Sequence, residues 1–168
     1  QFRKCLLVYF LAVTGIFVSV AGYAQTPSPG VNNITARKAD TLFFQGDWKG
    51  AKSMYESVDP AQLNAANWVR LGFSDYNLGY YDAAMAAYEK TLNINPPSPV
   101  KGIAYSRMAK IYALQNDKQK AFVALDSAVN NGYGNLKEMD TLKDFNSIRN
   151  ETGFKTLRQR IYAVANPC

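Results

Sequence analysis

The side chains that most often carry chemistry are unevenly represented in this chain. Its 168 residues contain no histidine, two cysteines, and 13 aspartates and glutamates. The lack of histidine removes the commonest general base and the commonest metal ligand, and with them the Ser-His-Asp and Cys-His catalytic sets. The sequence also has no G-x-S-x-G, P-loop or G-x-G-x-x-G pattern. We therefore expect a protein that is not an enzyme, with no catalytic residue, no metal ligand and no cofactor.

The basic residues do not indicate a nucleic-acid partner. The formal net charge is +6, and it falls to +4 if Arg3 and Lys4 leave with a signal peptide, because 17 basic and 13 acidic residues then remain. Recognition of nucleic acid usually needs lysine and arginine clustered on one face, with aromatic side chains between them for base stacking. The sequence shows no such cluster, so we expect no binding to nucleic acid.

The first residues have the layout of a signal peptide. Arg3 and Lys4 precede a run, residues 5–21, that contains no charge and few polar groups. Small residues close this run in the A-x-A-like arrangement that a signal peptidase cleaves. We expect residues 1–24 to be removed after Ala24, and the mature protein to be exported, to a periplasm or out of the cell, in a bacterium.

The same segment could instead remain as a membrane anchor. A spanning helix needs about 20 apolar residues, and no charged side chain follows Lys4 until Arg37. We expect membrane contact only through this segment, and only if it is not cleaved. Residues 25–31 are rich in turn-forming residues with little to bury, which predicts a flexible leader.

The middle of the chain has the apolar spacing of two paired helices. Between residues 67 and 96, apolar side chains recur every three or four positions in two stretches separated by Gly79. This period predicts a helical hairpin, in which Gly79 adopts the left-handed conformation that ends the first helix. The residues that carry the pattern are Trp68, Leu71, Gly72, Ala84, Tyr88 and Pro96.

These residues resemble the signature of the tetratricopeptide repeat, a unit of 34 residues that forms one helical hairpin. The departure is Asp75, where the family usually has an aromatic residue. Related copies precede this unit by 33 residues and follow it by 37, which predicts hairpins at about 32–60, 65–96 and 102–131. The resemblance implies an all-α fold, a right-handed superhelical array of three hairpins over residues 32–133.

Residues 134–168 lose the period but keep an apolar spacing that predicts two short helices, with Asp140 and Asn150 as their N-caps. This segment is similar to a terminal motif that often closes tetratricopeptide arrays. Its expected role is to cap the array, because the last hairpin would otherwise expose an apolar face. The residues that carry the likeness are Gly132, Tyr133, Leu142, Phe145, Ile148, Arg149, Phe154 and Leu157.

The resemblance also implies a binding surface. In this family, first-helix residues that flank the signature line a concave groove, which commonly accepts a peptide. Aromatic residues would anchor apolar side chains there, and Arg107 and Lys110 would attract an acidic segment. Alternatively, the aromatics pack against neighbouring helices and the basic side chains form an ordinary solvated face. The predicted groove residues are Phe44, Arg70, Phe73, Tyr76, Asn77, Arg107, Lys110 and Leu114.

These features lead to one functional expectation and one alternative. We expect a non-catalytic module of the cell envelope that binds a peptide or protein segment in the groove. The alternative is a constitutive structural subunit of a larger envelope or secretion assembly. The clamping of a C-terminal carboxylate that some tetratricopeptide proteins perform is not expected, because only Arg107 falls at one of the clamping positions.

Overall fold

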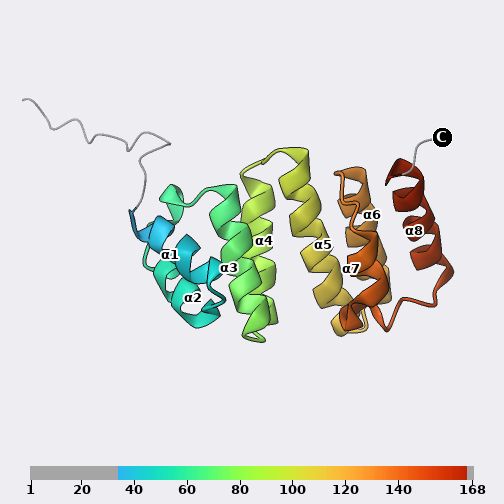
Figure 1. The fold of residues 1–168 in the computed structure, drawn as a ribbon, viewed down its shortest axis with the longest axis horizontal. Coiled ribbons are helices and arrows are strands. Elements are labelled where there is room, and N and C mark those ends of the chain that lie inside the picture. The colour runs from blue at the N-terminus through green and yellow to red at the C-terminus, as the bar shows by residue number, and fades with distance from the viewer. Residues whose placement is uncertain (1–33, 166–168) are drawn as a thin grey trace, which may run out of the picture. The chain divides into compact units, whose positions relative to one another are not determined.

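The computed structural model describes residues 34–165, and within that range every regular element is helical (Figure 1). The all-α prediction is therefore confirmed for this part of the chain. The predicted signal peptide, 1–24, and leader, 25–31, lie outside the described residues. Of the helices that are described, none combines the length and apolar character needed to cross a membrane. The α-helices are α1 (Ile34–Phe44), α2 (Trp48–Glu56), α3 (Ala65–Asn77), α4 (Tyr81–Asn93), α5 (Ser98–Leu114), α6 (Lys118–Asn130), α7 (Leu136–Thr141) and α8 (Thr152–Ala165), and the 3-10 turns are η1 (Pro60–Gln62) and η2 (Lys143–Phe145).

The first six helices form three consecutive hairpins. Helix α1 packs with α2, α3 with α4, and α5 with α6, and Figure 1 shows the helices side by side. The turns inside the hairpins are tight, because Gly46, Gly79 and Asn116 have φ values of 79°, 80° and 59°. This left-handed conformation costs glycine almost nothing and is tolerated by asparagine. The left-handed turn expected at Gly79 is thus present.

Two glycines set the distance between paired helices. A Cβ atom on Gly72 in α3 would lie 2.6 Å from Cε1 of Tyr88 in α4, which is fully buried. A Cβ atom on Gly102 in α5 would lie 2.8 Å from the backbone oxygen of Asn131 at the end of α6. Both distances are shorter than van der Waals contact. The paired helices can therefore reach their observed separation only if positions 72 and 102 carry no Cβ atom.

Position 75, where the sequence departs from the tetratricopeptide pattern, holds a buried ion pair. Oδ1 of Asp75 lies 2.8 Å from Nζ of Lys52 in α2. Burial raises the pKa of the Asp75 carboxyl, and its contact with Lys52 opposes that change. A charged contact between the first and second hairpins therefore takes the place of the aromatic packing that the family usually has there.

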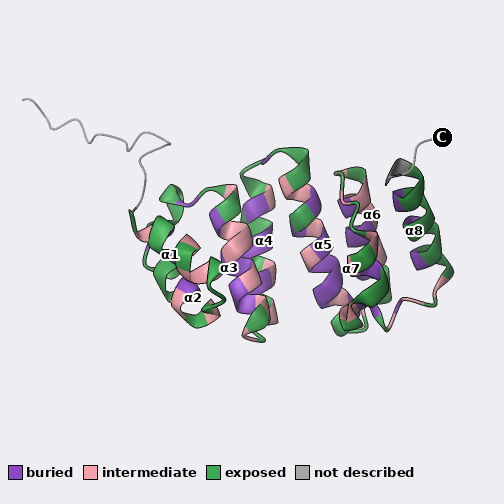
Figure 2. Cartoon of the chain, viewed as in Figure 1, coloured by how far each residue is buried: buried purple, intermediate pink, exposed green. Residues whose placement is uncertain are grey.

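The buried residues form two clusters, visible as the purple parts of the helices in Figure 2. The N-terminal cluster joins α1, α2 and α3 and includes Ala39, Ala51 and Tyr55. The C-terminal cluster is larger and extends from α4 to α8, where Phe154 and Leu157 are buried. Residues of the predicted cap are therefore part of the core, and α8 packs against α6 as a cap would.

The C-terminal segment differs from its prediction in two respects. The N-cap of α7 is Asn135, whose Oδ1 accepts a hydrogen bond of 3.0 Å from the Glu138 amide. Asp140 lies inside α7, so its prediction as an N-cap is wrong; its carboxylate instead forms two hydrogen bonds, of 2.6 and 2.7 Å, with Arg158. Helix α8 is not short, since it has 14 residues, and it begins at Thr152, two residues after Asn150.

Candidate functional site

The eight predicted groove residues all lie on the first helices of the hairpins, α1, α3 and α5. We call the exposed surface of these three helices the first-helix face. Part of it borders a cleft of about 540 Å³ between α3, α5 and α7, which we call the α3–α5–α7 cleft. The structure brings five of the predicted residues together there, and Phe44, Arg70 and Leu114 lie outside the cleft lining. The five are Phe73, Tyr76, Asn77, Arg107 and Lys110.

Aromatic rings lie next to the cleft on its N-terminal side. The ring of Phe73 contacts those of Phe43 and Trp48 edge-on, with centroids 5.7 and 5.4 Å apart, and stacks on Tyr76 at 6.4 Å. Phe73 is half-buried by these contacts, whereas the side chain of Phe44 is 73% exposed. The alternative that aromatic residues pack against their neighbours thus holds for Phe73, while Phe44 remains open to a partner.

Two predicted arginines are held over aromatic rings. The guanidinium carbon of Arg107 lies 4.5 Å from the ring centroid of Phe73, and that of Arg70 lies 5.2 Å from the centroid of Phe44. Each is also fixed by a carboxylate: Nη1 of Arg70 lies 2.8 Å from Asp40, and Nη1 of Arg107 lies 3.4 Å from Glu138. A stacked and paired guanidinium loses little further freedom when it binds another group.

Lys110 does not serve as the exposed steering residue that the sequence predicted. Its side chain is 2% exposed and pairs with Glu138 of α7. Burial and the nearby charge of Arg107 lower the pKa of Lys110 from 10.5 to about 7. The carboxylate of Asp144 acts in the opposite direction, because a nearby negative charge favours the charged form of lysine. The acidic group that Lys110 holds belongs to the same chain, so this part of the prediction is wrong.

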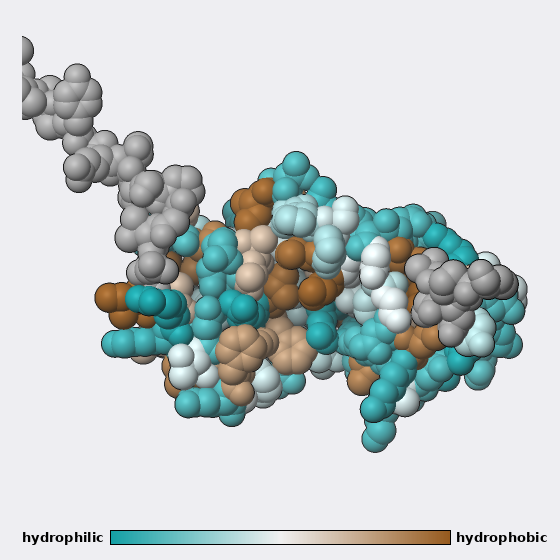
Figure 3. Space-filling view, turned by 45° about the horizontal axis from the view of Figure 1, so that its top comes forward, coloured by the Kyte–Doolittle hydropathy of each residue, from teal (hydrophilic) through white to brown (hydrophobic). Residues whose placement is uncertain are grey.

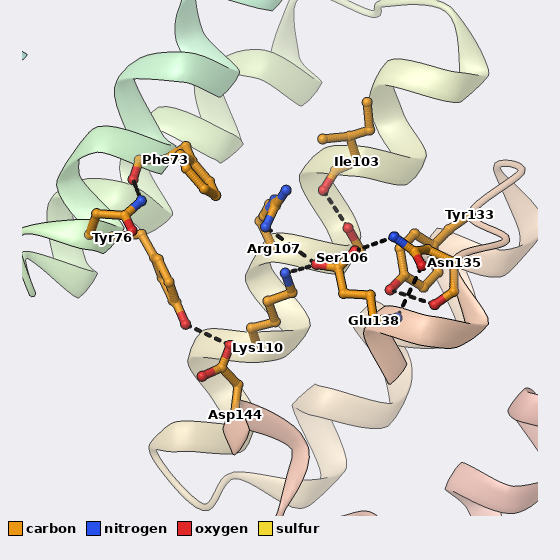
Figure 4. Close-up of polar contacts among 11 residues, drawn as sticks. Phe73, Tyr76, Ile103, Ser106, Arg107, Lys110, Tyr133, Asn135, Glu138 and Asp144 are labelled. Carbon is orange, nitrogen blue, oxygen red and sulfur yellow. Dashed lines mark hydrogen bonds and ion pairs between the residues drawn. The ribbon is translucent and has the colours of Figure 1, made fainter. Parts of the chain in front are cut away.

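Helix α7 and the segment after it supply a wall of the cleft that sequence reasoning did not include. Figure 4 shows Glu138 reaching toward α5, and Asp144 meeting Tyr76 of α3. The Tyr76 hydroxyl donates to Asp144 Oδ2 at 2.7 Å; burial, followed by this bond, raises the pKa of Tyr76. The wall residues are Asn135, Lys137, Glu138, Thr141, Leu142 and Asp144.

A signal for this wall is present in the sequence. The repeat period places a further first helix after Gly132. This glycine has a φ of 88° and follows the last helix of the third hairpin, just as Gly46 and Gly79, also with positive φ, follow the first helices of the first two hairpins. Helix α7 begins four residues later and lies against α5, where Glu138 meets Lys110. It therefore stands in the place of a shortened fourth first helix.

The remaining predicted residues have smaller parts in the site. Nδ2 of Asn77 donates to the backbone oxygen of Phe73 at 2.7 Å, within α3. Leu114, at the end of α5, is 42% exposed. No group of three or more potential metal ligands occurs among the residues that the structure describes.

Exposed apolar side chains alone do not identify a site. On the face drawn in Figure 3, several brown and tan apolar groups lie next to one another near the middle, and hydrophilic groups surround them. Val123 on α6 is 64% exposed and lines a second cleft of about 440 Å³, together with Tyr105 and Tyr112 of α5. Scattered residues of this kind are usual on protein surfaces. What distinguishes the first-helix face is the combination of exposed rings with positioned arginines.

Comparison with known proteins identifies one unit of the array. A family model for the tetratricopeptide repeat matches residues 65–98, which contain α3 and α4. No curated protein matches the chain. The resemblance drawn from Trp68, Gly72 and Tyr88 is therefore confirmed at the middle hairpin, and the chain contains a tetratricopeptide repeat.

Proposed function

We propose that this tetratricopeptide-repeat protein is a non-catalytic binding module whose first-helix face holds a segment of a partner protein. Such repeats generally mediate protein–protein interaction. The observation that carries the proposal is the α3–α5–α7 cleft, whose lining includes both Phe73 and Arg107. Apolar and charged groups that converge in one concave site are typical of binding surfaces.

The contacts around the cleft support binding because they fix its geometry before a partner arrives. Arg107 is held by Phe73 on one side and Glu138 on the other, and Tyr76 is held by Asp144. Side chains already fixed in place lose little entropy on association, which favours affinity. Phe44, which is exposed nearby on α1, adds an apolar contact that costs no rearrangement of the core.

The proposal includes a location in the cell envelope, supported by the signal-peptide layout of residues 1–24. The measurement is N-terminal sequencing of the protein recovered from its source cells. A mature chain that begins at Gln25 and is found outside the cytoplasm is expected. A full-length chain in the cytoplasm contradicts the location without affecting the binding proposal.

The binding proposal is tested with two matched surface variants. Phe44→Ser and Val123→Ser each replace one exposed apolar side chain, 73% and 64% exposed, on the first-helix face and on α6 respectively. Both should fold normally, because surface substitutions usually change stability by less than about 0.5 kcal/mol. Proteins that the native chain retains from an extract of the source cells are identified, purified, and titrated against all three chains.

We expect Phe44→Ser to weaken the identified complex by about tenfold, as loss of one apolar anchor does, and Val123→Ser to leave it unchanged. A complex that is insensitive to Phe44→Ser but weakened by Val123→Ser contradicts the proposal, because the contact would then involve the cleft between α5 and α6. Equal affinity for all three chains contradicts it as well.

A further inference from the structure

An arginine occupies the same register position in each of the three hairpins. Arg37, Arg70 and Arg107 are separated by 33 and 37 residues, the same intervals that separate the hairpins. They lie on α1, α3 and α5, and Arg37 is exposed while the other two are partly exposed. The first-helix face therefore carries one guanidinium for each hairpin.

The surroundings of these arginines follow the same register. Nη1 of Arg70 lies 2.8 Å from Oδ1 of Asp40 in the preceding hairpin. The guanidinium carbon of Arg107 lies 4.5 Å from the ring centroid of Phe73, which occupies in the middle hairpin the position that Asp40 occupies in the first. A guanidinium has five N–H donors, and within residues 34–163 Arg107 uses only Nη1, in one hydrogen bond of 3.4 Å. These unused donors lie in the plane of the guanidinium, whose central carbon is 4.5 Å from the centroid of the Phe73 ring.

The acidic side chains of the α3–α5–α7 cleft already have partners. Glu138 accepts hydrogen bonds from Lys110, Arg107 and, at 3.1 Å, Asn135, and Asp144 accepts one from Tyr76. Lys137 lines the cleft from the α7 side, and it forms no ion pair with any residue that the structure describes. The polar groups of the cleft that remain available to a ligand are mainly positively charged hydrogen-bond donors.

We propose that the α3–α5–α7 cleft binds an aspartate or glutamate side chain of an acidic, extended partner segment between Arg107 and Lys137. The segment continues along the first-helix face, where Arg70 and then Arg37 meet further carboxylates. This inference rests on the proposed function and names the chemistry of the partner. Arginine is suited to the task because its fork of donors matches the two oxygens of a carboxylate.

The structure also sets the spacing of the acidic residues. Packed neighbouring helices lie about 8–10 Å apart, and a peptide in the extended polyproline II conformation rises about 3.1 Å per residue and has three residues per turn, so that side chains three positions apart point the same way. Carboxylates that meet arginines on successive first helices are therefore about three positions apart in the partner. A side chain between them that faces the protein reaches the ring of Phe73, so an apolar residue is expected there.

Synthetic peptides test the chemistry directly with the purified native chain. The first peptide carries two glutamates three positions apart with a leucine between them, the second replaces both glutamates by glutamine, and the third places the glutamates next to each other. Affinity is measured by fluorescence anisotropy at low and high salt. We expect the first peptide to bind at least tenfold more tightly than either of the others, and salt to reduce that difference by screening the charges.

Charge-removing variants then locate the site. We expect Arg107→Gln and Lys137→Gln each to weaken the first peptide, by about tenfold for Arg107 because it loses a charge-assisted pair. Lys155→Gln, which removes one positive charge from an exposed position on α8, should have no effect. Lys137 is exposed, so its variant remains informative if loss of Arg107 disturbs folding.

Three results would overturn the inference: equal binding of the glutamine peptide, equal binding of the peptide with adjacent glutamates, or an equal loss of affinity in Lys155→Gln and Arg107→Gln. The last would show a dependence on net charge alone. These failures are distinguishable from failure of the proposed function. If the purified natural partner still requires Phe44 while acidic peptides fail, the first-helix face binds a partner of another chemistry.

Discussion

The buried pair between α5 and α7 leads to a prediction about stability that depends on which member is removed. Lys110 is 2% exposed and Glu138 is 16% exposed. Glu138→Gln leaves the ammonium group buried without its counter-charge, which typically costs 3–5 kcal/mol. Because Glu138 is partly exposed, we expect a loss of about 3 kcal/mol at pH 5, where Lys110 is charged, at the lower end of that range. Lys110→Met removes the buried charge itself, and Glu138 keeps Arg107 and Asn135, so we expect a loss below about 1 kcal/mol.

The assay is urea unfolding followed by circular dichroism. With a slope of about 2 kcal/mol per M, a loss of 3 kcal/mol lowers the unfolding midpoint by about 1.5 M. The double variant, Glu138→Gln with Lys110→Met, should recover most of the loss, which gives a coupling of about 2–3 kcal/mol in the double-mutant cycle.

The loss of stability in the Glu138→Gln variant should depend on pH. Burial and Arg107 lower the pKa of Lys110 in the folded chain to about 7, below its ordinary value of 10.5. Between these values the unfolded chain binds more protons than the folded one, so stability rises with pH. Removal of Glu138 lowers this pKa further, so the loss in Glu138→Gln should be largest below pH 7 and should shrink as the pH rises through about 7, where Lys110 becomes neutral in both folded chains. Equal losses in the two single variants, or a loss in Glu138→Gln that does not depend on pH, would refute the reasoning.

Three further predictions follow from contacts elsewhere in the fold. Gly72→Ala should lower the free energy of unfolding by about 1–2 kcal/mol in urea, because a Cβ atom 2.6 Å from Tyr88 overpacks the hairpin by more than the gain in helix propensity; an unchanged midpoint would contradict this. Burial and Asp144 raise the pKa of Tyr76, so its contribution to stability is present below pH 10 and lost at higher pH. Tyr76→Phe should therefore show a shallower alkaline decline than the native chain when the two are melted across pH 9–12, and parallel curves would count against it. Arg149 donates to the backbone oxygens of Met139, Asp140 and Leu142, so Arg149→Leu should cost about 3 kcal/mol of stability; calorimetry that shows an unchanged melting temperature would exclude this role.

The helices of the array could be predicted because their determinants are local. Gly79 ends α3 by its left-handed conformation, and Gly72 opposite Tyr88 requires a close helix pair. Each of these features lies within a single repeat unit and can be recognised from residue type and spacing. For the same reason the sequence identified the hairpin that the family comparison matches at residues 65–98.

The repeat period indicates a helix after Gly132, but the contacts that make this helix a wall of the cleft could not be predicted in the same way, because their determinants are distant in sequence. Asn135 and Asp140 are both good N-cap residues, and the observed choice depends on burying Met139 in the core while Asp140 meets Arg158. Lys110 was expected to be exposed, since nothing near it in sequence indicates that Glu138, 28 positions away, covers it. Position along a helix predicts the face on which a residue lies, but not what another segment does to that face.

The division of the core into two clusters has a consequence for how the molecule opens. Helices α1 and α2 belong to the smaller cluster, rich in alanine, whereas α5, α7 and α8 share the larger one with Phe145, Ile148 and Phe154. In stacked repeats each unit is stabilised mainly by its neighbours, so fluctuations begin where the least apolar surface is shared. Backbone amides of α1 and α2 should thus exchange with deuterium before those of α5. A segment that bridges Arg37 and Arg107 would join the two clusters, and slower exchange in the first hairpin would report that the face is occupied.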